Sequence, residues 1–189
     1  RQAGVELITG EAVLDGPHGV RVTAEGAART LSAERVVIAT GASPHPGPWA
    51  FDGERILSYR DLLALPELPQ SLAIIGGGVI GCEFASCFAN LGVPVTLIEQ
   101  QAQLLPAEDA EAVRFLTQRL RGAGVTVLTG SGVRRLASSA AGVEIELESG
   151  QAVTAQRCLV AVGIRPNSQG LGLEALGIAA QGGIAVNEH

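Results

Sequence analysis

The chain has 189 residues and a net charge of −6, with 47% hydrophobic and 17% charged residues. Such a composition can fill a core, which excludes a disordered tail, and acidic charge spread along the chain argues against a nucleic-acid surface. No apolar run approaches the roughly 18 residues of a membrane helix and the amino terminus shows no signal-peptide pattern, so we expect no membrane association.

The basic residues are all arginines, and lysine is absent from the sequence. This excludes a Schiff-base lysine or a Walker-type phosphate lysine within the chain. The three cysteines form no framework pattern, which is typical of a reducing, cytoplasmic setting. The sequence contains no methionine and begins at Arg1. We therefore expect a fragment of a longer chain.

The first forty residues are β-rich, and a proline- and glycine-rich connector follows at residues 41–53. Short apolar runs separated by Gly, Asp and Pro predict strands at 5–8, 11–14, 19–23 and 35–39. After the connector, residues 58–65 form a candidate helix that Ser58 caps and Pro66 ends.

Residues 72–128 alternate between strand and helix patterns. The apolar run 72–75 predicts a central parallel strand buried on both faces. A helix over 79–91, a strand over 94–99, an amphipathic helix over 107–122 and a strand over 125–128 follow. Gly92 is placed to end the first helix. The second helix carries acids in its first turn and arginines in its last, as the helix dipole favours.

Hairpin-like runs follow at 133–137, 143–148 and 152–154, and an apolar strand at 158–162 closes the domain. The order strand, helix, strand, helix, strand is one mononucleotide-binding half of a Rossmann sheet. The predicted fold class is α/β: a Rossmann-like three-layer domain with a parallel sheet and an added β-meander, plus a partial β-rich segment of another domain.

The strongest motif is G-x-G-x-x-G at Gly76, Gly78 and Gly81, directly after the buried strand and at the head of a helix. Gly76 permits the tight turn, Gly78 lets the backbone approach a pyrophosphate, and Gly81 allows close helix packing. The pyrophosphate would lie on the unpaired N–H groups at the helix N-terminus. The alternative is a glycine turn that merely packs tightly, but the surrounding pattern favours dinucleotide binding.

An acidic residue, Glu99, ends the next strand, eighteen residues beyond Gly81. At this position a carboxylate accepts hydrogen bonds from the adenosine ribose hydroxyls. The same carboxylate repels the 2′-phosphate of NADP, and no basic residue follows until Arg114. The sequence therefore favours NAD.

Cys82 and Cys87 have the spacing of a known redox disulfide. On one undistorted helix their Cα atoms would lie about 8.7 Å apart. A disulfide needs less than about 7 Å, so the helix cannot hold this bridge. We expect both cysteines to be buried structural thiols.

Four ordered motifs resemble the pyridine nucleotide-disulfide oxidoreductases, which are flavoproteins with two dinucleotide sites. They are "VVIATGASP" at 36–44, the glycine-loop segment at 56–92, "LLPAEDAEAVRFLTQRL" at 104–120 and "LVAVGIRPNSQGLGLEALGI" at 159–178. The resemblance covers nearly the whole chain. Within the family, the sequence is most similar to the dihydrolipoamide dehydrogenases.

The resemblance implies a division of the chain between two cofactors. Residues 1–45 would belong to an FAD-binding domain, 46–68 would be a connector, 69–170 would form the NAD-binding domain, and 171–189 would return toward the FAD domain. The residues implied to hold NAD are Gly76, Gly77, Gly78, Val79, Ile80, Gly81, Glu99, Val133 and Gly163.

Glu83 corresponds to a glutamate that lies near the nicotinamide in relatives and pairs with a lysine. Since this chain has no lysine, Glu83 could instead be a solvated helix residue. Ile164 replaces an arginine usual in the dehydrogenases, as in NADH oxidase-like relatives. His18, His45 and His189 correspond to no catalytic position, and we expect surface or loop histidines.

The resemblance also implies what a parent protein would add. The first FAD-binding glycine loop and the redox-active cysteine pair would precede Arg1. A second flavin motif and a dimerisation domain would follow His189, so the parent would be a homodimer. The implied reaction is hydride transfer between NAD and FAD, with lipoamide or a lipoyl group as substrate, and the fragment alone would be inactive. An NADH oxidase-like or mercuric reductase-like flavoenzyme and a non-catalytic dinucleotide-binding or redox-sensing module remain alternatives.

Overall fold

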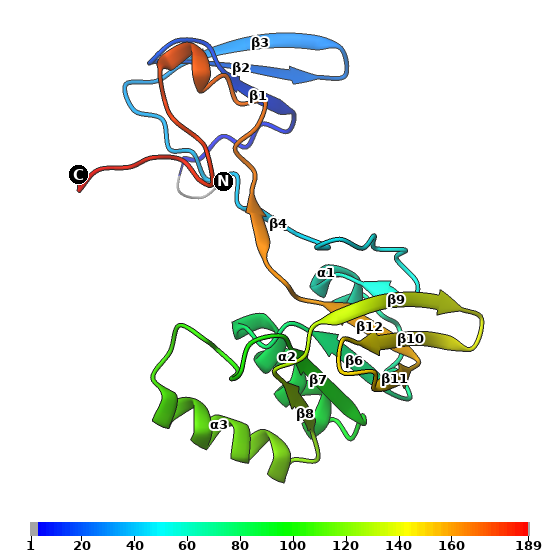
Figure 1. Ribbon diagram of the computed structural model, residues 1–189. Coiled ribbons are helices and arrows are strands. Elements are labelled where there is room, and N and C mark those ends of the chain that lie inside the picture. The colour runs from blue at the N-terminus through cyan, green and yellow to red at the C-terminus, as the bar shows by residue number, and fades with distance from the viewer. Residues whose placement is uncertain (1–3, 189) are drawn as a thin grey trace. The chain divides into compact units, whose positions relative to one another are not determined.

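The computed structural model describes residues 4–188, which form two compact units (Figure 1). Unit 1 comprises Arg1–Ser43 and Arg165–His189, and unit 2 comprises Pro44–Ile164. The chain passes between the units at β4 (Ala42–Pro44) and β13 (Ile164–Pro166). Within the described part of the chain, no helix is long and apolar enough to cross a membrane.

Unit 1 is built on an antiparallel meander of β1 (Glu11–Leu14), β2 (Gly19–Ala24) and β3 (Ala27–Ser32). The β2–β3 turn places Glu25 at φ +50° and Gly26 at φ +81°. Positive φ at both central residues is the geometry that closes a tight two-residue hairpin. A short 3₁₀ helix, η1 (Glu174–Leu176), lies in the carboxyl-terminal part of the unit.

Two strands expected from sequence are absent from the described residues of unit 1. Residues 5–8 and 35–39 are irregular, although both are mostly apolar and contain β-branched residues. Leu7 and Val37 are each 87% exposed. A strand needs a hydrogen-bonding neighbour, and neither segment has one within the described chain.

Unit 2 contains a five-stranded parallel sheet in the order β5-β12-β6-β7-β8. The strands are β5 (Ile56–Leu57), β6 (Leu72–Ile75), β7 (Val95–Glu99), β8 (Thr126–Thr129) and β12 (Arg157–Val160). The predicted alternation of strands and helices, and with it the predicted fold class, is confirmed.

Alternate residues of the sheet serve two cores. Leu72 and Ile74 pack against α1 (Tyr59–Leu63), α2 (Val79–Asn90) and α3 (Ala110–Gly122). Ala73 and Ile75 pack against the antiparallel meander of β9 (Val133–Ser139), β10 (Gly142–Leu147) and β11 (Ala152–Ala155). Since side chains of a strand alternate between faces, an unbroken apolar strand is covered on both. The helices and the β-meander are the two outer layers.

The helix ends follow local sequence signals. Ser58 forms the predicted cap of α1, in a capping box with Asp61. Gly92, at φ +83°, follows α2 as expected. The α3 prediction was wrong at its start: Asp109 is the N-cap and its carboxylate accepts the N–H groups of Glu111 and Ala112, so the helix begins at Ala110. A residue whose side chain caps the first N–H groups of a helix has a non-helical backbone itself, so it lies just outside the helix.

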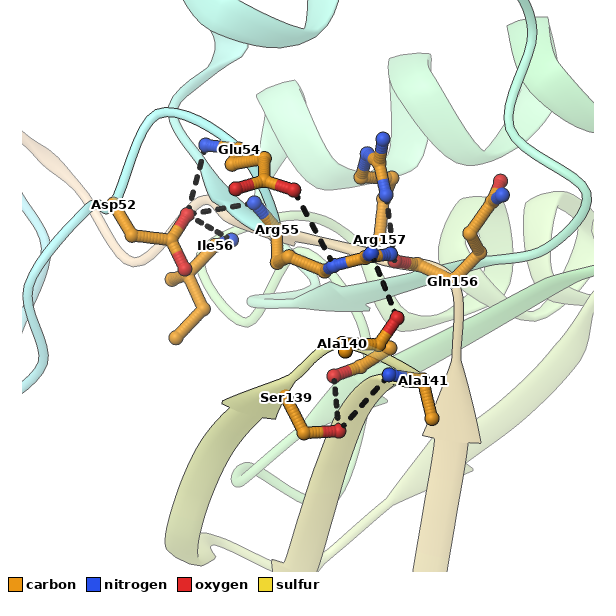
Figure 2. A network of polar contacts seen from close by, with 10 residues as sticks. Asp52, Glu54, Arg55, Ile56, Ser139, Ala140, Ala141, Gln156 and Arg157 are labelled. Atoms are coloured by element: carbon orange, nitrogen blue, oxygen red, sulfur yellow. Dashed lines mark hydrogen bonds and ion pairs between the residues drawn. The ribbon is translucent and has the colours of Figure 1, made fainter.

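A polar network holds the connector against the edge of the sheet (Figure 2). The Asp52 carboxylate accepts the main-chain N–H groups of Glu54, Arg55 and Ile56 at 2.9, 2.6 and 2.8 Å. The Arg55 guanidinium donates to the carbonyl oxygen of Ala140, at 2.9 Å, in the β9–β10 turn. The connector is therefore an ordered part of unit 2.

Candidate functional site

A cleft of about 690 Å³ opens at the carboxyl ends of the parallel strands of unit 2. Open α/β sheets bind ligands at this edge, where the loops after the strands meet. The cleft is lined by His45, Gly47, Pro48, Trp49, Ile75, Gly76, Gly78, Val79, Ile80, Ile98, Glu99, Gln100, Pro106, Ser131, Gly132, Val133, Glu148, Ala161, Val162, Gly163 and Ile164.

Two glycines of the loop allow a turn that other residues would block. Gly76 has φ +110°, and a Cβ there would lie 2.4 Å from the Ala161 carbonyl oxygen. A Cβ on Gly81 would lie 1.8 Å from the Gly76 carbonyl oxygen. Any side chain at these positions would force the backbone apart, so glycine is required for this close approach.

Gly78 differs from these two because it faces open space. Apart from atoms of Gly78 and its two chain neighbours, no described atom lies within 4 Å of the place where its Cβ would be. Gly78 is also the N-cap of α2, and the described chain offers this end neither a capping side chain nor an acid in the first turn. The first N–H groups of a helix lack internal acceptors and carry partial positive charge, so this end suits an anion.

Glu99 lies beside the loop at the end of β7 and is only 8% exposed. Its Oε2 atom accepts the Gly77 N–H at 2.7 Å, and its Oε1 atom accepts the Gln101 N–H at 2.7 Å. The carboxylate thus organises the loop as well as lining the cleft. Each carboxylate oxygen has a second lone pair available to a ligand.

The structure brings together most residues predicted for the site. Val79 and Ile80 line the cleft at the start of α2, and Val133 and Gly163 line it from β9 and from the segment after β12. Gly77 lies behind the cleft wall, where a Cβ would be 2.5 Å from Leu104 Cδ2. Glu83 is exposed on α2 and is outside the cleft lining. Its place near a nicotinamide remains a prediction.

Sequence reasoning missed most of the other lining residues, and three of them bear on the chemistry of the cleft. His45 and Trp49 belong to the segment read as a plain connector, and Glu148 lies in the β10–β11 turn. This loop histidine lines the cleft, and its Nδ1 atom accepts the Gly47 N–H at 2.9 Å. His18 lies in unit 1 and is exposed, and His189 lies outside the described residues. For His45 and Trp49, the available sequence signal was the high proportion of proline and glycine in residues 41–53. Such a segment can be a stiff, ordered turn as readily as a linker.

The charge of the cleft lining is negative. Glu99 and Glu148 contribute carboxylates, and no Lys or Arg is among the described lining residues. Gly132 lies against the Glu148 carboxylate, since a Cβ on Gly132 would be 2.9 Å from Glu148 Oε2. The acidic residues therefore lie at the end of the cleft formed after β7 and β8.

The cysteines do not form a redox pair in this chain. Cys82, Cys87 and Cys158 are free thiols, as expected for the first two. Burial, followed by the Glu99 and Glu83 carboxylates, raises the pKa of Cys82 to about 11. Burial also raises the pKa of Cys158. The expectation of burial was wrong for Cys87, which is exposed because it lies on the outer face of α2.

Comparisons with known proteins agree on one family. The model of the family described as pyridine nucleotide-disulphide oxidoreductase matches residues 1–189. A dihydrolipoyl dehydrogenase of Chlorobaculum tepidum is 40% identical over 97% of this chain and 40% of its own length. An NAD(P)H dehydrogenase (quinone) of Mycobacterium tuberculosis is 38% identical over 93% of this chain and 37% of its own length.

Among solved structures, LpdA from Mycobacterium tuberculosis superposes with a TM-score of 0.85 and 37% identity, covering 96% of this chain and 41% of that one. The chain thus spans about 40% of the length of the curated relatives that it matches.

Proposed function

Because the chain belongs to the pyridine nucleotide-disulphide oxidoreductase family, we propose that the cleft of unit 2 binds NAD(H). The observation that carries the proposal is the open turn at Gly78. There the uncapped N-terminus of α2 meets a cleft large enough for a dinucleotide. The diphosphate would lie on the first N–H groups of α2, with Gly76 and Gly81 providing the turn and the close packing.

The proposed coenzyme is NAD rather than NADP. A 2′-phosphate would bring about two negative charges to the end of the cleft that already holds Glu99 and Glu148. The described cleft lining contains no arginine or lysine that could neutralise the phosphate. The ribose hydroxyls of NAD, in contrast, can donate to the second lone pairs of Glu99.

For the parent protein, we propose hydride transfer between NAD and FAD, coupled to a redox disulfide. The preferred substrate is lipoamide or the lipoyl group of a larger complex, which the 40% identity to dihydrolipoyl dehydrogenase supports. FAD would be held mainly outside this chain, with residues 1–45 and 171–189 contributing to its domain. The parent would be a homodimer, and the 189-residue chain alone would bind NADH without turnover.

A quinone is the second candidate for the parent's electron acceptor. This alternative is favoured by the 38% identity to the NAD(P)H dehydrogenase (quinone). Since both relatives cover the same part of this chain, the cleft itself does not separate the two acceptors. Assaying the parent with lipoamide and with a quinone, each with NADH, decides between them.

The test of the coenzyme proposal is a titration of the chain with NADH and NADPH. Trp49, the sole tryptophan, lines the cleft, so bound NADH should quench its emission by energy transfer. We expect NADPH to bind at least about tenfold more weakly, equivalent to about 1.4 kcal/mol of repulsion.

Gly78→Ala should abolish the quenching, because its methyl group would occupy the space for the diphosphate. Gly122→Ala is the matched control: this glycine also has open space around it, but it lies at the end of α3, outside the cleft. Wild-type protein whose emission is unchanged by millimolar NADH would refute the proposal.

A further inference from the structure

The Gly77 peptide is held by four groups of the protein. Its N–H donates to Glu99 Oε2 at 2.7 Å. Its carbonyl oxygen accepts the Leu105 N–H at 2.8 Å and the Cys82 thiol at 3.4 Å. The Leu104 side chain packs against its Cα, as the 2.5 Å distance from a Gly77 Cβ to Leu104 Cδ2 indicates. These contacts hold both polar groups of Gly77 and its Cα within the protein.

The bonds to the Gly77 carbonyl also orient the next amide. A peptide group is planar and trans, so the N–H of Gly78 points opposite to the C=O of Gly77. The carbonyl faces Leu105 and Cys82 in the interior. The Gly78 N–H therefore points away from the interior, on the side where Gly78 lines the cleft and meets open space.

The segment that supplies this bond has a strained backbone. Leu105 has φ +44°, a conformation that β-branched and bulky residues such as leucine rarely adopt. Leu104 beside it is fully buried in the helix-side core. The Leu105 carbonyl oxygen in turn accepts the Glu108 N–H at 2.9 Å, just before α3. Strain of this kind persists where surrounding contacts impose it, as the burial of Leu104 does here.

We propose that Leu104 and Leu105 are positioning residues for the coenzyme, forming a latch that presents the Gly78 N–H to the diphosphate. Leu104 anchors the latch in the core, and the Leu105 N–H fixes the Gly77 carbonyl. The proposal rests on the proposed function, in that the bound group is the diphosphate of NAD(H). The loop between β7 and α3 thereby contributes to binding mainly through atoms behind the cleft wall.

The test compares Leu104→Ala with Leu120→Ala. Both leucines are buried in the same core cluster, but Leu120 lies on α3, away from the Gly77 peptide. Both variants should lose a similar amount of thermal stability, because each loses the same buried side-chain atoms. We expect only Leu104→Ala to weaken NADH binding, by about tenfold, measured by Trp49 quenching at a temperature where all proteins are folded.

Amide hydrogen exchange, measured without coenzyme, tests whether Leu104 and Leu105 hold the Gly77 peptide. Amide hydrogen exchange should accelerate at Gly77 and Leu105 by at least about tenfold in Leu104→Ala, beyond any change in Leu120→Ala. Gly77→Ala should also weaken NADH binding, because its methyl group would lie 2.5 Å from Leu104 Cδ2 and 2.9 Å from Glu99 Cβ and would displace the Gly77 peptide.

The outcomes separate the two proposals. Wild-type protein that fails to bind NADH overturns the proposed function and the coenzyme-positioning role, while exchange at Gly77 still decides whether the latch exists. Wild-type protein that binds NADH, with Leu104→Ala binding it equally well, overturns the latch alone. Equal losses of affinity in Leu104→Ala and Leu120→Ala also overturn it, because general destabilisation would then explain both.

Discussion

Replacing Glu99 with glutamine should destabilise unit 2 before any coenzyme is added. The carboxylate is buried and accepts two main-chain N–H groups, from Gly77 and Gln101, both at 2.7 Å. Glutamine has nearly the same shape, but only one of its two terminal atoms is an acceptor. In Glu99→Gln, one of the two N–H groups must therefore face the NH₂ group and lose its partner.

The magnitude follows from the two bonds. A hydrogen bond to a charged group contributes about 1.5–3 kcal/mol and one between neutral groups about 1 kcal/mol. Glu99→Gln loses one hydrogen bond to a charged group, and the remaining bond becomes one between neutral groups. Part of this loss is offset, because burying a neutral amide costs less free energy than burying a carboxylate. We expect a net loss of about 2–3 kcal/mol in the free energy of unfolding. For a chain of this size, that lowers Tm by about 4–12 °C.

The assay is urea unfolding followed by the fluorescence of Trp49, which reports on unit 2 because it is the chain's sole tryptophan. The matched control is Glu83→Gln, which makes the same chemical change on the exposed face of α2 and should shift stability by no more than about 0.5 kcal/mol. If Glu99→Gln unfolds at the same urea concentration as the wild type, the carboxylate does not organise the glycine loop and the reasoning is refuted.

Other predictions concern the loop, the thiols and the connector. Gly81→Ala should cost about 3 kcal/mol or more in urea unfolding, because its methyl group would lie 1.8 Å from a backbone oxygen, whereas Gly78→Ala should keep wild-type stability. Native protein at pH 8 should react with a thiol reagent rapidly at Cys87 and slowly at Cys82, whose pKa is raised to about 11; mass spectrometry showing equal labelling would contradict the burial of Cys82. Burial raises the pKa of Asp52, but the three backbone N–H groups that it accepts lower the pKa further, to below 3.8. The ionised carboxylate therefore stabilises the fold above pH 3.8, and this contribution is lost as the pH falls below that value. Tm measured from pH 7 to pH 3 should therefore fall less steeply in Asp52→Asn than in the wild type.

The strands and helices of unit 2 were predictable because their signals are local. The apolar run of β6, the Ser58 cap of α1 and the Gly92 stop after α2 each act within a few residues. Strands that have no local sequence pattern, and that form because a neighbouring strand pairs with them, were missed. β5 has two residues and exists because β12 lies beside it, and β3 is largely exposed and pairs with β2 after a tight turn.

The candidate site divides in the same way. The glycine spacing and the acid at the end of β7 predicted the loop and one wall of the cleft, because both follow from a single strand–helix–strand unit. Trp49 and Glu148 also line the cleft, and they come from segments 99 residues apart in the chain. Long-range packing brings them together, and no short-range pattern encodes it.

The sequence by itself determined the α/β class, the order of the central elements and the turn that only glycine can make at Gly76 and Gly81. These depend on side-chain periodicity and backbone sterics, which act over one or two turns of chain. The tertiary structure decided what the turn is attached to: the Glu99 carboxylate, the Leu104–Leu105 latch and the negative end of the cleft. Those features depend on where groups distant in the chain meet, because a hydrogen bond or a buried contact is set by distance in space rather than by separation in sequence.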